Sequence, residues 1–421
     1  MDNREKALKQ TFHLSAWLKA DDTKRLVSNF FSLAVLQGVN YILPFVTLPY
    51  LIRVLGAEYF GLIAFANAMI TYLLIVTDYG FNLTATRDIS IYRNDNKKII
   101  EIFSAVMIIK IALMSACFLL LCILVMSFEK FSENSCIYFF TFGTVIGQVL
   151  FPVWFFQGME RMKYITYLNI LARSFFTVAI FICVKDRDDF YIVPILSSLG
   201  FLVAGLLSLL IVKIKFNIRF EWQSRQMILS YLKKSWNVFI IDFMPNLYNN
   251  FSTFLLGFVA SMEMVGYYSL ATKIIDIFNN FIYVVRNATY PYLNKNFEQF
   301  SIISQMTLLT GISFSIAIVC LSNSLFYIIF GDMIQKSLLY VYILVLSPFF
   351  LSVSVVFGSN KLLVLKKDQE MKNITILFSL FGFIMAISLI PLYGAVGAAT
   401  TVILTRGFMA YLTYNTAKKI I

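Results

Sequence analysis

The stretch IFSAVMIIKIALMSACFLLLCILVM, residues 102–126, contains only one charged residue, Lys110. A helix of about 20 apolar residues crosses the roughly 30 Å hydrocarbon core of a bilayer. The stretch is too long for a strand of a membrane barrel, which has about 10 residues of alternating polarity. A helix also satisfies its own backbone hydrogen bonds in lipid. The stretch therefore predicts a transmembrane helix and an all-α membrane fold.

Similar apolar runs recur along the whole chain. Hydrophobic residues make up 59% and charged residues 14% of the 421 residues, whereas soluble domains are about half apolar and about a quarter charged. The runs predict about twelve transmembrane helices, at 27–52, 61–80, 102–126, 136–156, 164–184, 192–214, 236–259, 267–286, 303–328, 338–357, 374–390 and 394–416. The connections between them are too short for a soluble domain that could work alone.

Lys and Arg are unevenly distributed between the two sides of the expected membrane. The odd-numbered connections hold only five of them: Arg53, Lys130, Lys185, Arg187 and Lys336. Most of the others lie in the even-numbered connections and at the two termini, and cytoplasmic loops carry such an excess. We therefore expect both termini in the cytoplasm. The net charge of +12 then reflects topology and attraction to membrane lipid, and not nucleic-acid binding.

A short internal repeat divides the chain into two halves. EYFGLIAFA at 58–66 aligns with EMVGYYSLA at 263–271, and MKYIT at 162–166 aligns with MKNIT at 371–375. Each half holds an even number of expected helices, so the halves should be parallel repeats about an axis along the membrane normal. The predicted parts are a cytoplasmic N-terminal segment 1–26, an N-lobe 27–214, a cytoplasmic linker 215–235 and a C-lobe 236–421, with a central cavity between the lobes.

Polar residues follow helical spacing in four of the expected helices, those at 27–52, 61–80, 236–259 and 267–286. Residues three or four apart share one helix face, and polar faces inside a membrane line a cavity or another helix. The candidates for polar lining and ion coupling are Asp78, Asp242, Asp276, Asn40, Asn67, Asn246, Asn249 and Asn280. Two alternatives stay open: the amide stripes hold neighbouring helices together, and Lys273 pairs with Asp276 for structural reasons.

Basic residues outnumber acidic ones within the expected helices and at their ends. A cavity with this balance suits an anionic group, and Arg in particular binds phosphate oxygens in a bidentate fork. Phosphate or pyrophosphate is therefore the expected ligand group. The candidate cations, in order of preference, are Lys273, Arg53, Arg286, Arg173, Arg406 and Lys110.

Several kinds of chemistry lack the residues that they need. The chain has no Gly-x-x-x-x-Gly-Lys-Ser/Thr phosphate loop, and its one histidine, His13, lies in the polar N-terminal segment. ATP hydrolysis, a His-based triad and a zinc site in the membrane are therefore not expected. We expect no catalytic residue, metal or cofactor, and we expect energy, where it is needed, from a gradient of H⁺ or Na⁺.

Motifs in fixed order along the chain carry a resemblance to a known family. They are LPYL at 48–51, GAEYFG at 56–61, FPVWFFQGMERMK at 151–163, VGYYSLATK at 265–273 and YPYL at 290–293. The chain resembles the Wzx-type polysaccharide flippases of the polysaccharide transport family, in the multidrug/oligosaccharidyl-lipid/polysaccharide exporter superfamily. The resemblance covers nearly the whole chain, from about 25 to 415.

The resemblance implies two six-helix lobes in a V shape around a cationic cavity, in the bacterial inner (cytoplasmic) membrane. It implies that undecaprenyl-pyrophosphate-linked oligosaccharide, such as an O-antigen unit for lipopolysaccharide biosynthesis, is flipped to the periplasmic leaflet by alternating access. The implied partners are this lipid-linked oligosaccharide, membrane lipid, a polysaccharide polymerase and a chain-length regulator. One alternative is a cation-coupled multidrug antiporter, whose cavity should favour acids. Another is a membrane polymerase or acyltransferase, which the short outer connections and the single histidine disfavour.

Overall fold

A computed structural model describes the backbone of residues 21–294, 296–322 and 324–419, and the side chains of these residues except 21–37, 39–42, 44, 45 and 249. His13 lies outside the described residues, and so do the side chains of Asn40 and Asn249. The described part of the chain consists of helices joined by short connections, without strands. The expected all-α membrane class is confirmed.

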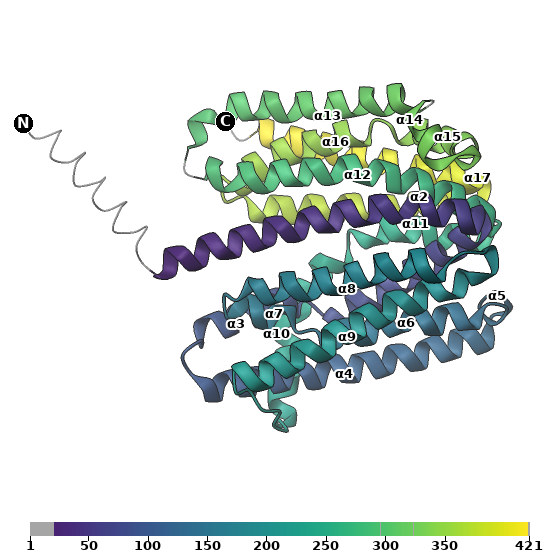
Figure 1. Cartoon of the computed structure of the whole chain (residues 1–421). Helices are drawn as coiled ribbons and strands as arrows, with labels where there is room; N and C mark the ends of the chain where they lie inside the picture. Colours follow the sequence, from purple (N-terminus) through teal and green to yellow (C-terminus); the bar gives the residue numbers. More distant parts are fainter. Residues whose placement is uncertain (1–20, 295, 323, 420–421) are drawn as a thin grey trace, which may run out of the picture.

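The helices of the first half run from α2 to α9 and those of the second half from α10 to α17 (Figure 1). In the first half they are α2 Asp21–Asp78, α3 Phe81–Ile91, α4 Asn96–Ser127, α5 Glu129–Ser132, α6 Ser135–Leu150, α7 Val153–Gly158, α8 Met162–Cys183, η1 Arg187–Tyr191 and α9 Ile192–Lys215. In the second half they are α10 Arg225–Phe243, α11 Asn246–Val259, α12 Met262–Leu293, η2 Phe297–Gln299, α13 Phe300–Ser322, α14 Leu325–Phe330, α15 Asp332–Leu344, α16 Ser347–Ser354, η3 Val355–Leu363 and α17 Asp368–Lys418.

Two of these helices are too long for one crossing, and each bends at a glycine. The backbone of α2 leaves the helical region at Gly56 (φ 71°, ψ 177°) and that of α17 at Gly394 (φ 54°, ψ −129°). Both φ values are positive, which glycine adopts without the steric cost that a Cβ brings. The chain of α17 folds back on itself at this bend. The two parts of the helix lie side by side, since a Cβ at Gly382 would lie 2.7 Å from Thr405 Oγ1. The bend at Gly56 lies in the gap between two expected spans, and the bend at Gly394 lies at the first residue of the expected span 394–416.

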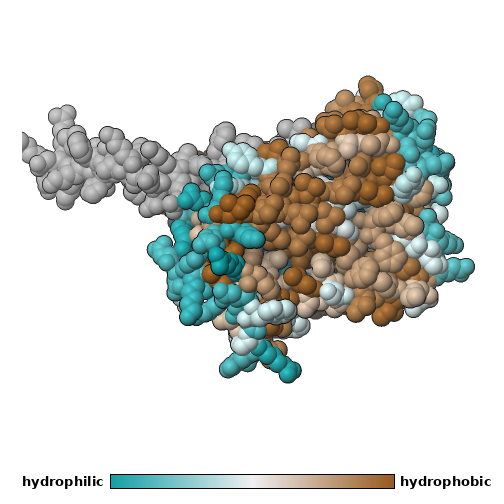
Figure 2. All heavy atoms as spheres, turned by 60° about the horizontal axis from the view of Figure 1, so that its bottom comes forward, coloured by the Kyte–Doolittle hydropathy of each residue, from teal (hydrophilic) through white to brown (hydrophobic). Residues whose placement is uncertain are grey.

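Eight segments of the described chain are long and apolar enough to cross a bilayer, and two of them are the bent pairs. The helix α12 is not among the eight, and it carries Lys273, Asp276 and Arg286. Figure 2 shows a broad apolar band between two hydrophilic ends on one face of the molecule. The protein is therefore a multi-pass membrane protein, while the number of twelve crossings stays a prediction.

The expected span at 236–259 is broken in the structure. The helix α10 ends at Phe243, and α11 begins again at Asn246 after Pro245. Proline lacks the N–H that would continue the helix, which explains a break at this point. The helix α10 begins inside the predicted linker 215–235 and lies against the first half: Lys234 Nζ is 2.6 Å from Asp88 Oδ2.

The two halves pack together most closely at the repeated motif. A Cβ at Gly61 would lie 1.9 Å from the carbonyl oxygen of Met262 and 2.6 Å from the backbone nitrogen of Gly266. A Cβ at Gly266 would lie 2.0 Å from the carbonyl oxygen of Ala57. Only glycine allows such a close approach of α2 and α12, and Gly61 and Gly266 are equivalent in the repeat.

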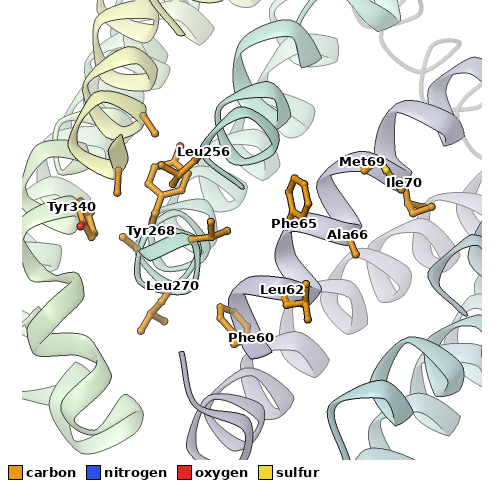
Figure 3. Close-up of a cluster of buried hydrophobic side chains, with 14 of the residues drawn as sticks. Phe60, Leu62, Phe65, Ala66, Met69, Ile70, Leu256, Tyr268, Leu270 and Tyr340 are labelled. Carbon is orange, nitrogen blue, oxygen red and sulfur yellow. The ribbon is translucent and has the colours of Figure 1, made fainter. Parts of the chain in front are cut away.

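A hydrophobic cluster surrounds this contact. Figure 3 shows Phe60 and Phe65 of α2 across from Tyr268 and Leu270 of α12. At the same end of the bundle, Arg53 donates to the carbonyl of Ile328 in α14. Lys130 Nζ also donates to the carbonyl oxygens of Phe258 (3.3 Å) and Ala260 (3.4 Å). The two halves are therefore closed against each other at this end, which we call the Gly61 end.

Candidate functional site

A cavity of about 650 Å³ lies between the two halves. Its walls come from α2, α11, α12 and the part of α17 that follows Gly394. A volume of about 300–1,000 Å³ is typical of sites that hold a small-molecule-sized group. The polar and charged lining residues are Asn67, Thr71, Asn246, Asn250, Thr253, Tyr268, Ser269, Thr272, Lys273, Asp276, Asn279, Asn280, Tyr283 and Arg406.

Three charged side chains lie together in this lining. Arg406 Nη2 is 3.9 Å from Asp276 Oδ1, and Arg406 also donates from Nη1 to Ser347 Oγ. The Arg406 side chain is mostly buried, with 14% exposed, whereas the Asp276 side chain is 52% exposed. Arg406 is thus fixed in place by two partners, while the carboxylate faces the cavity.

Lys273 is exposed to the cavity and has no hydrogen-bond or ion-pair partner in the described part of the chain. The i,i+3 pair with Asp276 that the sequence allowed is absent, because Asp276 is turned toward Arg406. The lining therefore carries two cations and one carboxylate. An unpaired cation at membrane depth is costly, by at least about 2.5 kcal/mol, and an anionic ligand would offset this cost.

Three of the amide candidates line the cavity, and each comes from a different helix. Asn67 of α2, Asn246 of α11 and Asn280 of α12 line the cavity. Thr71 and Thr253 lie one or two turns from these amides on the same helices, as the polar spacing predicts. The cavity thus brings together Lys273, Arg406, Asp276 and three of the predicted amides.

The other predicted residues lie outside the cavity lining. Lys110 is almost fully buried within the first half, and its Nζ is 2.6 Å from Asp78 Oδ1. Asp78 also accepts from Asn82 Nδ2 at 3.0 Å. Both charges of this pair are satisfied within the fold, so neither is free for a ligand in this conformation.

Four more predicted residues are also separate from the cavity lining. Arg53 lies at the Gly61 end, where it joins the two halves. Arg173 lies on α8 and Asp242 on α10. Arg286 follows Lys273 on α12 by more than three turns. Charge and position along the chain made these side chains candidates, but they do not show which helix faces meet.

Sequence reasoning missed a second polar row on α12. Ser269 and Asn279 are buried and line the cavity, and Ser269 Oγ and Asn279 Oδ1 have no hydrogen-bond partner among the described residues. Tyr268 lines the cavity beside Ser269. The available signal was the run of polar residues directly beside the Lys273 stripe, which widens the polar face of α12.

An acidic turn at Asp186–Asp189 lies outside the cavity lining. Asp189 Oδ2 accepts from the backbone N–H of Lys185 (2.9 Å) and of Asp186 (3.0 Å). The cluster therefore closes a turn and has no place in the candidate site.

The fold and the lining residues define the chain as a multi-pass membrane protein with a polar cavity between two helical halves. The computed structure aligns with the lipid II flippase MurJ in an inward closed conformation (TM-score 0.66, 13% identity, 94% of this chain and 87% of that chain). It also aligns with an inward-facing multidrug resistance MATE family transporter of the MOP superfamily (TM-score 0.64, 15% identity, 93% of this chain and 98% of that chain). At such low identity these similarities establish the fold alone.

The sequence comparisons also establish the family. The polysaccharide biosynthesis protein family model matches residues 26–297. Two curated relatives, each named "Putative O-antigen transporter", match 90% of this chain. The Escherichia coli (strain K12) protein is 30% identical over 93% of its own length, and the Shigella dysenteriae protein is 28% identical over 96%. The chain belongs to the polysaccharide biosynthesis protein family, and the resemblance to Wzx-type flippases is confirmed.

Proposed function

We propose that this chain flips undecaprenyl-pyrophosphate-linked oligosaccharide, such as an O-antigen repeat unit, from the cytoplasmic to the periplasmic leaflet. The observation that carries the proposal is the unpaired Lys273 beside Arg406 in a polar cavity between two membrane-embedded halves. The names of the two curated relatives support a polysaccharide-linked substrate. Both relatives are named as transporters, and this chain is accordingly a transporter and not an enzyme.

The chemistry of the cavity suits the headgroup of such a lipid. Lys273 is free to bind a phosphate oxygen, and Arg406 lies one helix away with its guanidinium held by Asp276 and Ser347. An arriving pyrophosphate competes with Asp276 for Arg406, and it carries more negative charge than one carboxylate. The lipid tail would stay in the bilayer, where its apolar surface needs no site in the protein.

The mechanism that we propose is alternating access. The halves are closed at the Gly61 end, and the Lys and Arg distribution supports a periplasmic position for that end. The headgroup would enter from the cytoplasmic side, and the halves would then separate at the Gly61 end. A headgroup drives this change only when it binds the two states with different affinity. Competition between the pyrophosphate and Asp276 for Arg406 is one contact that can differ between them.

Coupling to a gradient of H⁺ or Na⁺ belongs to the same proposal. Among Asp78, Asp242 and Asp276, only Asp276 is part of the described cavity lining. It is thus our first candidate for a coupling residue. A polymerase and a chain-length regulator are the proposed partners that would use the flipped product.

The charges of the cavity also bear on the alternative function, that of a multidrug antiporter. A cationic drug needs acidic partners, whereas the described lining holds two cations and a single carboxylate that is already turned toward Arg406. This balance favours an anionic substrate.

The proposal is tested in a host strain that lacks the gene. Lipid-linked oligosaccharide should accumulate on the cytoplasmic leaflet, and Lys273→Ala should fail to restore flipping although it inserts normally. Lys336→Ala, at an exposed lysine near the Gly61 end, is the control and should restore it. Unpolymerised repeat units on the cell surface of the deletion strain would contradict the proposal and favour a polymerase. Full activity of Lys273→Ala would remove Lys273 from the site.

A further inference from the structure

The charged residues of the cavity all lie on one side of it, and the opposite helices contribute only uncharged residues. The described charged lining residues come from α12 (Lys273 and Asp276) and α17 (Arg406). The described lining residues of α2 and α11 are uncharged, and their polar members are Asn67, Thr71, Asn246, Asn250 and Thr253. We call these five residues the amide wall. The cavity therefore has a charged side and a neutral side that does not suit a phosphate.

The amide wall has hydrogen-bonding groups that the fold does not use. The Asn67 side chain is exposed to the cavity, and among the described residues its amide has no hydrogen-bond partner. The Thr253 hydroxyl likewise has none there. A side-chain amide offers two donor hydrogens and two acceptor lone pairs, and a hydroxyl offers one donor and two lone pairs. These groups are thus free to bind a ligand with several hydroxyls.

Other members of the wall are held in fixed positions. Asn250 Nδ2 donates to Asn246 Oδ1 at 2.6 Å, and Asn246 Nδ2 donates to the carbonyl oxygen of Asp242 at 3.0 Å. Tyr72 donates from its hydroxyl to the carbonyl oxygen of Asn246 at 2.7 Å, which links α2 to the first turn of α11. The Oδ1 atom of Asn250 stays available as an acceptor. Groups fixed in this way lose little conformational entropy when they bind a ligand.

The chemistry of the wall selects among ligand classes. A lipid tail needs an apolar surface, and a phosphate needs cations, so neither fits a wall of neutral amides and hydroxyls. Sugar hydroxyls both donate and accept, and they match amides that offer both functions. We infer that the amide wall binds the sugar residues of the substrate and sets glycan preference, while Lys273 and Arg406 hold its phosphates. This inference rests on the proposed function, and it assigns the sugars and the phosphates of the substrate to different walls of the cavity.

The two walls make separable predictions for variants. Removing Lys273 weakens binding of every lipid pyrophosphate, whatever glycan it carries. Removing groups of the amide wall weakens binding only when sugars are present. The amide wall variant is Asn67→Ala combined with Thr253→Val, because neither side chain has a partner in the described structure whose loss would disturb the fold. The matched control is Asn169→Ala combined with Thr310→Val, at helical positions outside the cavity lining.

The test measures binding to the full chain in lipid nanodiscs with two probes. One is undecaprenyl pyrophosphate, and the other is lipid-linked oligosaccharide extracted from the source strain that lacks this gene. The amide wall variant should bind the oligosaccharide probe about tenfold more weakly, as expected for two lost hydrogen bonds. It should bind undecaprenyl pyrophosphate like the wild type, and the control should match the wild type with both probes.

Each other outcome has a distinct meaning. Equal weakening with both probes would show that the amide wall contacts the lipid pyrophosphate, and it would overturn the inference. No weakening with either probe would place the sugars elsewhere and would overturn it as well, with the flippase proposal intact. A wild-type chain that binds neither probe would remove the proposed function, and the division between the walls with it.

Discussion

The contact between Gly61 and Gly266 gives the sharpest prediction. A Cβ at position 61 would lie 1.9 Å from the carbonyl oxygen of Met262, which is backbone and cannot rotate away. Real Cβ contacts are not shorter than 3.0 Å, so α2 and α12 must separate by about one ångström to accept Gly61→Ala. The same argument applies to Gly266→Ala, with 2.0 Å to the carbonyl oxygen of Ala57. Both variants should destabilise closure at the Gly61 end.

The magnitude follows from the cost of overpacking. An added methyl group in a tightly packed contact costs about 1–3 kcal/mol. This cost arises only in the state that is closed at the Gly61 end, because the open state separates α2 from α12. A difference of about 1–3 kcal/mol changes the ratio of the two states about 5- to 150-fold. Gly61→Ala should therefore raise the proportion of molecules that are open at the Gly61 end.

The assay measures the distance between the two halves at that end. Spin labels at Glu129→Cys and Val259→Cys, in a background without the five native cysteines, report on the place where Lys130 reaches α11. Gly61→Ala should move the distance distribution to longer values and lower the flipping rate. Gly407→Ala is the control, since its nearest contact would be an ordinary 3.4 Å to the Phe350 ring. An unchanged distribution in folded Gly61→Ala would refute the reasoning that this glycine contact sets the approach of the halves.

Three further predictions concern stability. Asp78→Asn should lower the free energy of unfolding by about 2–4 kcal/mol, because it leaves Lys110 charged and buried. Lys110→Met should cost less, since Asp78 is 39% exposed and keeps its hydrogen bond from Asn82. Equal melting temperatures of the two variants in detergent would argue against this order. Gly56→Ala should destabilise more than Gly38→Ala, because φ 71° with ψ 177° is a region that essentially only glycine adopts, while a Cβ at either position would have nothing within 4 Å; equal melting temperatures would contradict a backbone origin. Lys234→Met removes the ammonium that lies 2.6 Å from the nearly buried Asp88 carboxylate and leaves Arg87, at 3.8 Å, as its ion-pair partner on the same helix. Hydrogen exchange in α10 should rise in this variant and not in Lys233→Met; equal exchange would mean that apolar packing alone holds α10.

Much of the fold could be predicted from hydropathy and spacing. The long apolar runs predicted helices where the structure has them, and the predicted spans separate at or next to the bends at Gly56 and Gly394. The polar spacing on 267–286 led to Lys273 and Asp276, and both line the cavity. These features are local: they depend on residues within a few turns of one another, which the sequence displays directly.

Contacts between distant segments could not be predicted in the same way. Lys110 was assigned to the cavity, but its partner Asp78 lies 32 residues earlier on another helix. The break before Pro245 sends α10 against the first half, through Lys234 and Asp88, and hydropathy alone draws one continuous helix there. In each case, the pairing depends on the rotational orientation of each helix about its own axis in the packed structure, which a single sequence does not specify.

The internal repeat explains why two glycines meet. In parallel repeats, an axis along the membrane normal relates each residue to its equivalent in the other half. A residue that contacts its own equivalent must lie on or near this axis, as in the self-complementary contact of a twofold dimer. Gly61 and Gly266 are such a pair, so the closest contact between the halves lies near the axis about which they are arranged. Small side chains there let the backbones touch, and the separation of the halves at this end begins with the loss of this one contact.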